Sequence, residues 1–95
     1  MSTLYYAEGA LEDLRRLAAF LQEEDPSAAR TTAALLMQGL KVLEAHPLIG
    51  RPLGGELHEL IISRGRTGYV GVYEYQERRD RVLVLAIRHQ REAGM

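Results

Sequence analysis

The stretch from residue 58 to residue 88, HELIISRGRTGYVGVYEYQERRDRVLVLAIR, decides the fold of this 95-residue chain. Along most of it the side chains alternate with the period of two that is typical of β-strands. The pattern predicts strands at residues 58–63, 69–75 and 81–88. Residues 65–68 and 76–80 separate them, and connections this short join neighbouring antiparallel strands. We therefore expect a three-stranded antiparallel meander.

The last two of these strands differ in the composition of their faces. The last strand is apolar on both faces, which predicts an interior position in the sheet. Its faces consist of Val82, Val84 and Ala86 on one side and Leu83, Leu85 and Ile87 on the other. The middle strand places Tyr69, Gly71, Tyr73 and Tyr75 on one side and Val70, Val72 and Glu74 on the other. One face of the sheet can therefore pack against helices while the other keeps polar groups.

The residues before the meander predict a short strand and two helices. Residues 2–6 contain Thr, Leu and two Tyr, which favour a strand. From Glu8 onward, apolar side chains recur at helical spacing: Leu11, Leu14, Leu17 or Ala18, and Leu21. Asp25 can cap a second helix whose first position is Pro26. Its apolar stripe is Ala29, Ala33, Leu36, Leu40 and Leu43, and it ends before His46. The link between the helices is so short that they must be antiparallel neighbours. The Pro- and Gly-rich residues 47–55 predict an irregular loop.

Together these elements predict a single α+β domain over residues 1–95, with the helical hairpin packed on one face of the sheet. The chain has no cysteine, and its histidines do not stand at metal-ligand spacing with a carboxylate, so we expect no metal and no cofactor. No apolar run approaches the roughly 20 residues of a membrane span, which predicts a cytoplasmic, soluble protein without a membrane partner. The 12 Lys and Arg residues against 13 Asp and Glu do not favour sequence-specific nucleic acid binding.

Several stretches, taken in order, resemble toxins of the ParE/RelE superfamily of type II toxin–antitoxin systems, and ParE-like members in particular. They are residues 7–14 (AEGALEDL), 25–30 (DPSAAR), 46–52 (HPLIGRP), 57–65 (LHELIISRG), 68–70 (GYV) and 87–94 (IRHQREAG). The resemblance covers essentially the whole chain. It implies a toxin neutralised by a small, ParD-like cognate antitoxin. ParE-like members poison DNA gyrase, which plasmid stabilisation systems exploit, whereas RelE-like members cleave mRNA on the ribosome.

The residues themselves favour an inhibitor over a nuclease. Metal-free RNA cleavage needs a base, an acid and cations around the phosphate. The nearest set is His58, Glu59, Arg64, Arg88, His89 and Arg91, of which His89, Arg64 and Arg88 would be catalytic. The tail after His89 contains no aromatic residue, and the sole lysine, Lys41, belongs to the second helix. Structural roles account for the same residues: His89 can bond to nearby backbone, Arg64 and Arg88 can pair with Glu59 or Glu74, and the tyrosines can fill the core.

We therefore expect a toxin without chemistry of its own that docks on DNA gyrase. The residues predicted to face the target are Arg64, Arg88, His89, Arg91 and Glu92. A hydrophobic groove between the helices and the sheet would take the antitoxin as a helix or an added strand. The residues predicted to line it are Leu14, Ala18, Leu21, Leu36 and Leu40. A ribosome-dependent mRNA endonuclease and an inactive homologue that binds only its antitoxin stay open as alternatives, as do a homodimer and a toxin–antitoxin complex.

Overall fold

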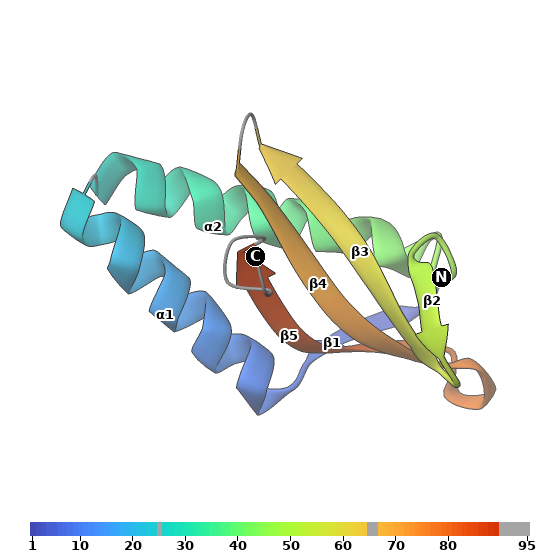
Figure 1. Cartoon of the computed structure of the whole chain (residues 1–95). Helices are drawn as coiled ribbons and strands as arrows, with labels where there is room; N and C mark the ends of the chain where they lie inside the picture. Colours follow the sequence, from blue (N-terminus) through green and yellow to red (C-terminus); the bar gives the residue numbers. More distant parts are fainter. Residues whose placement is uncertain (25, 65–66, 90–95) are drawn as a thin grey trace.

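The computed structural model describes residues 1–24, 26–64 and 67–89, with the side chains of residues 20–24, 26, 28, 29, 63, 64 and 67 outside the description. The elements in chain order are β1 (Thr3–Tyr6), α1 (Glu8–Glu24), α2 (Pro26–Lys41), the 3-10 helix η1 (Val42–Glu44), β2 (Arg51–Gly54), β3 (Leu57–Arg64), β4 (Thr67–Gln76), the 3-10 helix η2 (Glu77–Arg79) and β5 (Arg81–His89). Figure 1 shows the two α-helices as a hairpin beside a twisted sheet. None of the described helices is long and apolar enough to cross a bilayer.

The strands of the described residues form one five-stranded sheet in the order β1-β5-β4-β3-β2. Strands β2 to β5 pair with antiparallel neighbours, whereas β1 lies parallel to β5. The predicted meander is therefore confirmed. The interior position of the last strand is also confirmed, because β5 lies between β1 and β4.

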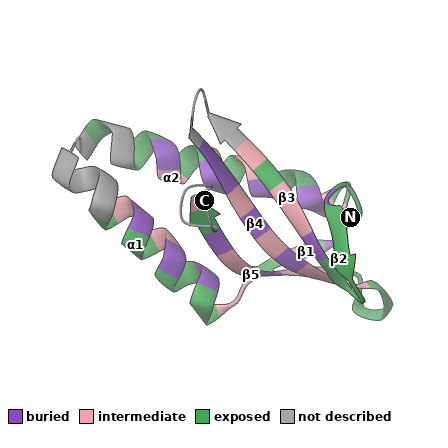
Figure 2. Cartoon of the chain, in the orientation of Figure 1, coloured by how far each residue is buried: buried purple, intermediate pink, exposed green. Residues whose placement is uncertain are grey.

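The hydrophobic core lies between the helical hairpin and one face of the sheet. The helices contribute Ala10, Leu17, Leu36 and Leu40, and the strands contribute Tyr69, Tyr73, Val82, Val84 and Ile87, each at most 6% exposed. Figure 2 shows the buried positions recurring along both helices and along β4. Full burial of one such side chain contributes about 1.5–3 kcal/mol, so the match between the helical stripe and the sheet face is what holds the layers together. The predicted α+β class is confirmed.

Two details of the expected fold were wrong, and both lie at the sheet. Residues 51–54, expected within an irregular loop, form the edge strand β2, where Pro52 is tolerated because an edge strand needs fewer backbone donors. In β5 the register on β4 shifts between Tyr73↔Val84 and Val72↔Ala86, which leaves Leu85 as a bulge. The bulge turns Ile87 into the core in place of Ala86, which is half-buried.

Candidate functional site

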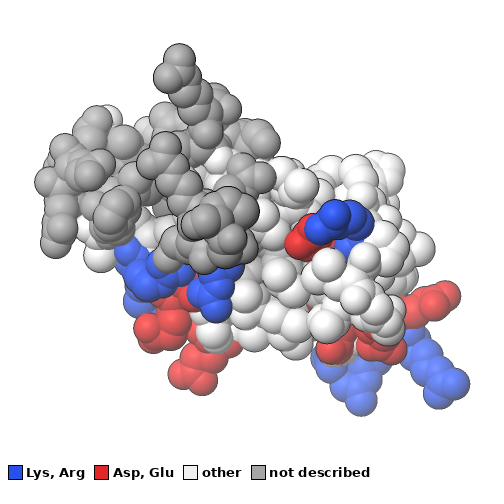
Figure 3. Space-filling view, viewed as in Figure 1, with Lys and Arg blue, Asp and Glu red and all other residues white. Residues whose placement is uncertain are grey.

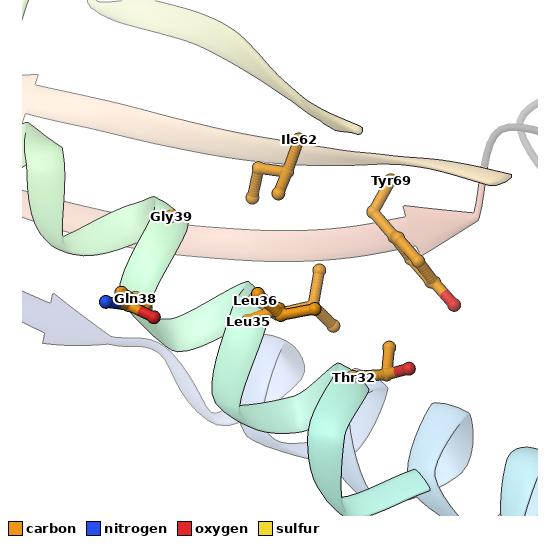
Figure 4. Close-up of a pocket in the computed structure, with 7 residues that line it drawn as sticks. All are labelled: Thr32, Leu35, Leu36, Gln38, Gly39, Ile62 and Tyr69. Atoms are coloured by element: carbon orange, nitrogen blue, oxygen red, sulfur yellow. The ribbon is translucent and has the colours of Figure 1, made fainter. Parts of the chain in front are cut away.

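A groove opens between α2 and the ends of β3 and β4. Its volume is about 280 Å³, and it is lined by Thr32, Leu35, Leu36, Gln38, Gly39, Ile62 and Tyr69. Figure 4 shows the side chains of Ile62 and Tyr69 pointing from the strands toward Leu36 and Thr32 on the helix. The floor is buried, since Leu36 is 2% exposed and Tyr69 4% exposed, while Leu35 is exposed at the rim. The groove can therefore take apolar side chains from a partner.

A close approach of α2 to β3 sets one end of this groove. A Cβ at Gly39 would lie 3.0 Å from Cγ2 of Ile62, so the helix packs tightly on the strand at this glycine. Toward Thr32, about two turns before Gly39 along α2, the wall opposite the helix is the ring of Tyr69 (Figure 4). The groove is therefore built mainly by α2, β3 and β4.

Of the residues predicted to line an antitoxin groove, the structure places Leu36 in this one. Leu40 is fully buried one turn further on, where it contacts Gly71 closely enough that a Cβ there would lie 2.9 Å from it. Leu14 is half-buried against the core, and Ala18 is half-buried on α1. The side chain of Leu21 lies outside the described residues. The helical period identified the buried stripe, whereas the groove runs along the border of that stripe.

A polar cluster joins α1 to the end of β5. Asp13 is 9% exposed and accepts hydrogen bonds with both carboxylate oxygens. Its Oδ2 accepts the buried backbone N–H of Ile87 at 2.9 Å, and its Oδ1 accepts Nη1 of Arg88 at 3.0 Å. Nη2 of Arg16 lies 3.7 Å from the same Oδ1. One carboxylate therefore fixes a helix, a strand and two cations together.

The early end of β1 explains why the fold needs the Asp13 carboxylate at this point. Strand β1 pairs with β5 only as far as Tyr6 opposite Val84, after which the chain turns into α1. Beyond that point the backbone N–H of Ile87 faces away from β4 and has lost its neighbouring strand. A buried donor without an acceptor would cost about 1–3 kcal/mol, and the Asp13 carboxylate removes that cost. Sequence analysis missed this role of Asp13, because its partner lies 74 positions away in the sequence.

His89 follows Arg88 at the end of β5 and contacts a residue of the groove. It lies opposite Tyr69 in the register of β4 and β5, and the two rings meet edge to face with centroids 5.1 Å apart. Because Tyr69 also lines the groove, the groove and the end of β5 form one continuous region.

On the face drawn in Figure 3, acidic and basic side chains lie intermixed beside α1.

The remaining predicted target-facing residues are placed only in part. The side chain of Arg88 is 48% exposed and pairs with Asp13, so its predicted pairing with Glu59 or Glu74 was wrong. Glu59 instead pairs with Arg51 across β2 and β3. The side chain of Arg64 and residues Arg91 and Glu92 lie outside the described residues.

His58, a member of the predicted nuclease set, is drawn into the interior. It is 8% exposed, and its ring stacks on Tyr73 with centroids 5.3 Å apart. Its Nδ1 lies 3.1 Å from the backbone oxygen of Glu56.

The core role predicted for Tyr69 and Tyr73 is confirmed, since each is at most 4% exposed. Within the described residues, His, Asp and Glu side chains form no cluster suited to a metal ion.

The hydroxyl of Tyr73 holds the loop before β2. It accepts the buried backbone N–H of Gly50 at 2.9 Å. A Cβ at Gly50 would lie 2.6 Å from this hydroxyl and 2.7 Å from the backbone oxygen of Glu59, so only glycine fits. Burial raises the pKa of Tyr73 above its ordinary value of 10.0, although the Gly50 hydrogen bond acts in the opposite direction. The protonated hydroxyl of Tyr73 therefore holds the loop against the sheet at Gly50.

Comparison with known proteins agrees with the fold and with its connectivity. Residues 4–94 match the family described as ParE toxin of type II toxin-antitoxin system, parDE. Toxin RelE3 of Caulobacter vibrioides is 32% identical over 92 residues, which cover 97% of this chain and 98% of that protein.

Solved structures of toxin–antitoxin systems share the architecture. The chromosomal ParDE system from P. aeruginosa superposes with a TM-score of 0.77 at 18% identity, covering 92% of this chain and 94% of that one. The intact E. coli RelBE complex gives 0.62 at 20% identity, with coverage of 92% and 94%. The RelBE2 complex from Mycobacterium tuberculosis gives 0.61 at 25% identity, with coverage of 94% and 98%. With a family match over nearly its whole length and a full-length relative above 30% identity, the chain belongs to the ParE toxin family of type II toxin–antitoxin systems.

Proposed function

We propose that this toxin acts by docking on DNA gyrase and that a ParD-like antitoxin neutralises it. Membership of the family makes the chain a toxin whose natural partner is an antitoxin. The choice of target rests on one observation, which is that the Asp13 carboxylate holds the guanidinium of Arg88 at 3.0 Å. A cation that must stabilise a phosphate in a transition state works best when no anion already neutralises it.

Moving the Asp13 carboxylate away from Arg88 would cost free energy. Its other oxygen accepts the buried Ile87 N–H, so moving Asp13 aside to admit a phosphate would leave a backbone donor unpaired. The His89 ring is packed edge-on against Tyr69 rather than standing alone at the end of the strand. A neutralised, fixed cluster of this kind suits recognition of a protein surface, where charge pairs set register and specificity.

The alternative is a ribosome-dependent endonuclease of the RelE type. One observation favours it, namely the 32% identity to a protein named Toxin RelE3. In that case His89 and Arg88 would have to act on RNA, and Arg88 would exchange its contact with Asp13 for a phosphate.

One experiment separates the two functions. The purified toxin is added to gyrase with relaxed DNA and ATP, and in parallel to translating ribosomes with mRNA. We expect inhibition of supercoiling and no mRNA cleavage. Cleaved mRNA with unimpaired gyrase would overturn the proposal, and the loss of both activities would indicate a homologue that only binds its antitoxin.

Two variants test whether the end of β5 takes part. We expect Arg88→Ala to weaken gyrase inhibition by about tenfold, the size of effect of one polar contact in an interface. Arg15→Ala is the matched control, because Arg15 is an exposed cation on α1 that pairs only at the surface with Glu12. Equal potency of the two variants, with both folded by far-ultraviolet circular dichroism, would remove Arg88 from the docking surface.

A further inference from the structure

The sheet has two faces, and the helices of the described residues pack on only one of them. Val70 and Val72 of β4 alternate with the buried Tyr69 and Tyr73, so they point away from the helices. Residues that lie opposite one another in neighbouring strands share a face, so the registers extend this surface over the whole sheet. We call it the outer face, and its apolar members are Tyr5, Ile61, Val70, Val72, Leu83 and Ala86.

The composition of the outer face is unusual for a sheet surface in contact with water. A solvated face normally carries polar side chains at alternate positions. Here Ile61 is 55% exposed and Tyr5 47% exposed, while Val72 and Leu83 are half-buried. Figure 3 views the sheet with β3 and β4 in front of α2, as in Figure 1, and shows a broad surface without charged side chains, broken by adjoining blue and red groups. Exposed apolar surface of this extent marks contact with another molecule.

The charged side chains of the outer face lie toward its borders, and they include both signs. They are Arg51, Glu59, Glu74, Arg81 and Arg88. Arg51 pairs with Glu59 beside β2, and Arg88 pairs with Asp13 at the end of β5. An apolar centre with a polar rim is the usual anatomy of a protein interface. Because the rim carries both signs, it does not favour a polyanion, whereas a copy of the same surface can meet it with opposite charges across a twofold axis.

The size of the outer face matches the area that a dimer needs. Its five strands, about 4.8 Å apart, make it roughly 24 Å wide. Strands β3, β4 and β5 contain 8, 10 and 9 residues, which makes the face about 26–33 Å long. Since β1 and β2 are shorter, the footprint is roughly 600 Å², which places a face-to-face dimer at the small end of the range for specific interfaces.

We propose that two copies of this toxin associate through their outer faces, sheet against sheet, around a twofold axis. Twisted sheets pack about 10 Å apart with their side chains interdigitated, as in β-sandwiches. Val72, on the middle strand of the sheet, would lie near the centre and be covered by the other copy. A second copy is favoured over an extended peptide or a single helix because another sheet matches both the twist and the width of this face. The inference rests on the sheet surface and not on the identity of the target.

Analytical ultracentrifugation of the purified toxin without any partner tests the proposal. We expect a monomer–dimer equilibrium with a Kd on the order of 10 µM, in keeping with a small interface. Val72→Lys and Ile61→Lys should each raise this Kd at least about tenfold, because an ammonium group would be buried between the sheets without a partner. Met37→Lys is the matched control, since Met37 is 49% exposed on α2 and should leave the Kd unchanged. Circular dichroism confirms that each variant is folded.

Two results would refute the dimer. One is a toxin that stays monomeric up to about 500 µM, well above the expected Kd. The other is a dimer that both lysine variants on the outer face leave intact, because the contact would then use another surface. If the wild type is monomeric and Val72→Lys instead abolishes gyrase inhibition, the outer face belongs to the target and the dimer is wrong. Because the ultracentrifugation contains no gyrase, a failed supercoiling assay leaves its outcome unaffected.

Discussion

Replacing Asp13 with alanine should destabilise the toxin far more than its place on a helix surface suggests. The substitution leaves the buried N–H of Ile87 without its acceptor, which costs about 1–3 kcal/mol. Loss of the ion pair to Arg88 adds at most about 1 kcal/mol, because that side chain is 48% exposed and water screens the charge. We expect a total loss of about 2–3 kcal/mol in the free energy of unfolding. For a domain of this size that corresponds to a fall in Tm of roughly 10–20 °C.

Urea unfolding followed by far-ultraviolet circular dichroism measures this loss. Glu12→Ala is the matched control, since Glu12 is the preceding acid on α1 and its side chain is 65% exposed in a surface pair with Arg15. That variant should lose less than about 0.5 kcal/mol. Asp13→Asn should fall between the two, because the amide oxygen can still accept the Ile87 N–H but carries no charge for Arg88. If Asp13→Ala and Glu12→Ala lose the same free energy of unfolding, the bond from Asp13 to the Ile87 N–H does not stabilise the fold.

Three further outcomes are expected. Tyr73→Phe should lower the free energy of unfolding by about 1–2 kcal/mol in urea, because the buried N–H of Gly50 loses its acceptor, and an unchanged value would contradict the clamp. Stability should decline above pH 10 in the wild type and less steeply in Tyr73→Phe: below pH 10 the phenol is protonated in both states, whereas above it the unfolded state, with the lower pKa, ionises first. Leu35→Asp, at the rim of the groove, should weaken antitoxin binding at least about tenfold in calorimetry, while Met37→Asp, at an exposed position of α2 outside the groove lining, should not.

Local periodicity was sufficient to predict most of the fold. The three- and four-residue spacing of leucines gave both helices, and the period of two in residues 58–88 gave the meander. Strand β2 was missed because Pro52 and Gly54 are typical of loops, and only its pairing with β3 makes the segment a strand. The bulge at Leu85 was missed because β5 is apolar on both faces, so the sequence carries no sign of where the faces exchange.

The candidate site was harder to predict because its contacts are distant in sequence. Asp13 and Ile87 lie 74 positions apart, and an acid in the first turns of a helix has a sufficient local explanation in the helix dipole. The groove depends on how closely α2 approaches β3 at Gly39, which is a packing result that no helical pattern contains. Its rim residue Leu35 falls outside the apolar stripe that the leucine spacing of α2 defines.

Near each edge of the sheet, an outer strand ends before its neighbour does and leaves backbone groups without a strand beside them. The two places differ in what replaces the missing strand. On one side, β1 ends at Tyr6, and the chain supplies Asp13 from α1 to bond the backbone that β1 no longer reaches. On the other side, β2 begins at Arg51, opposite Glu59 and directly after the Gly50 N–H that donates to Tyr73, so within the described residues no strand lies beside Ile61 on the outer side of β3. An unpaired edge beside an apolar groove is a liability for a protein that must persist alone, because it invites aggregation.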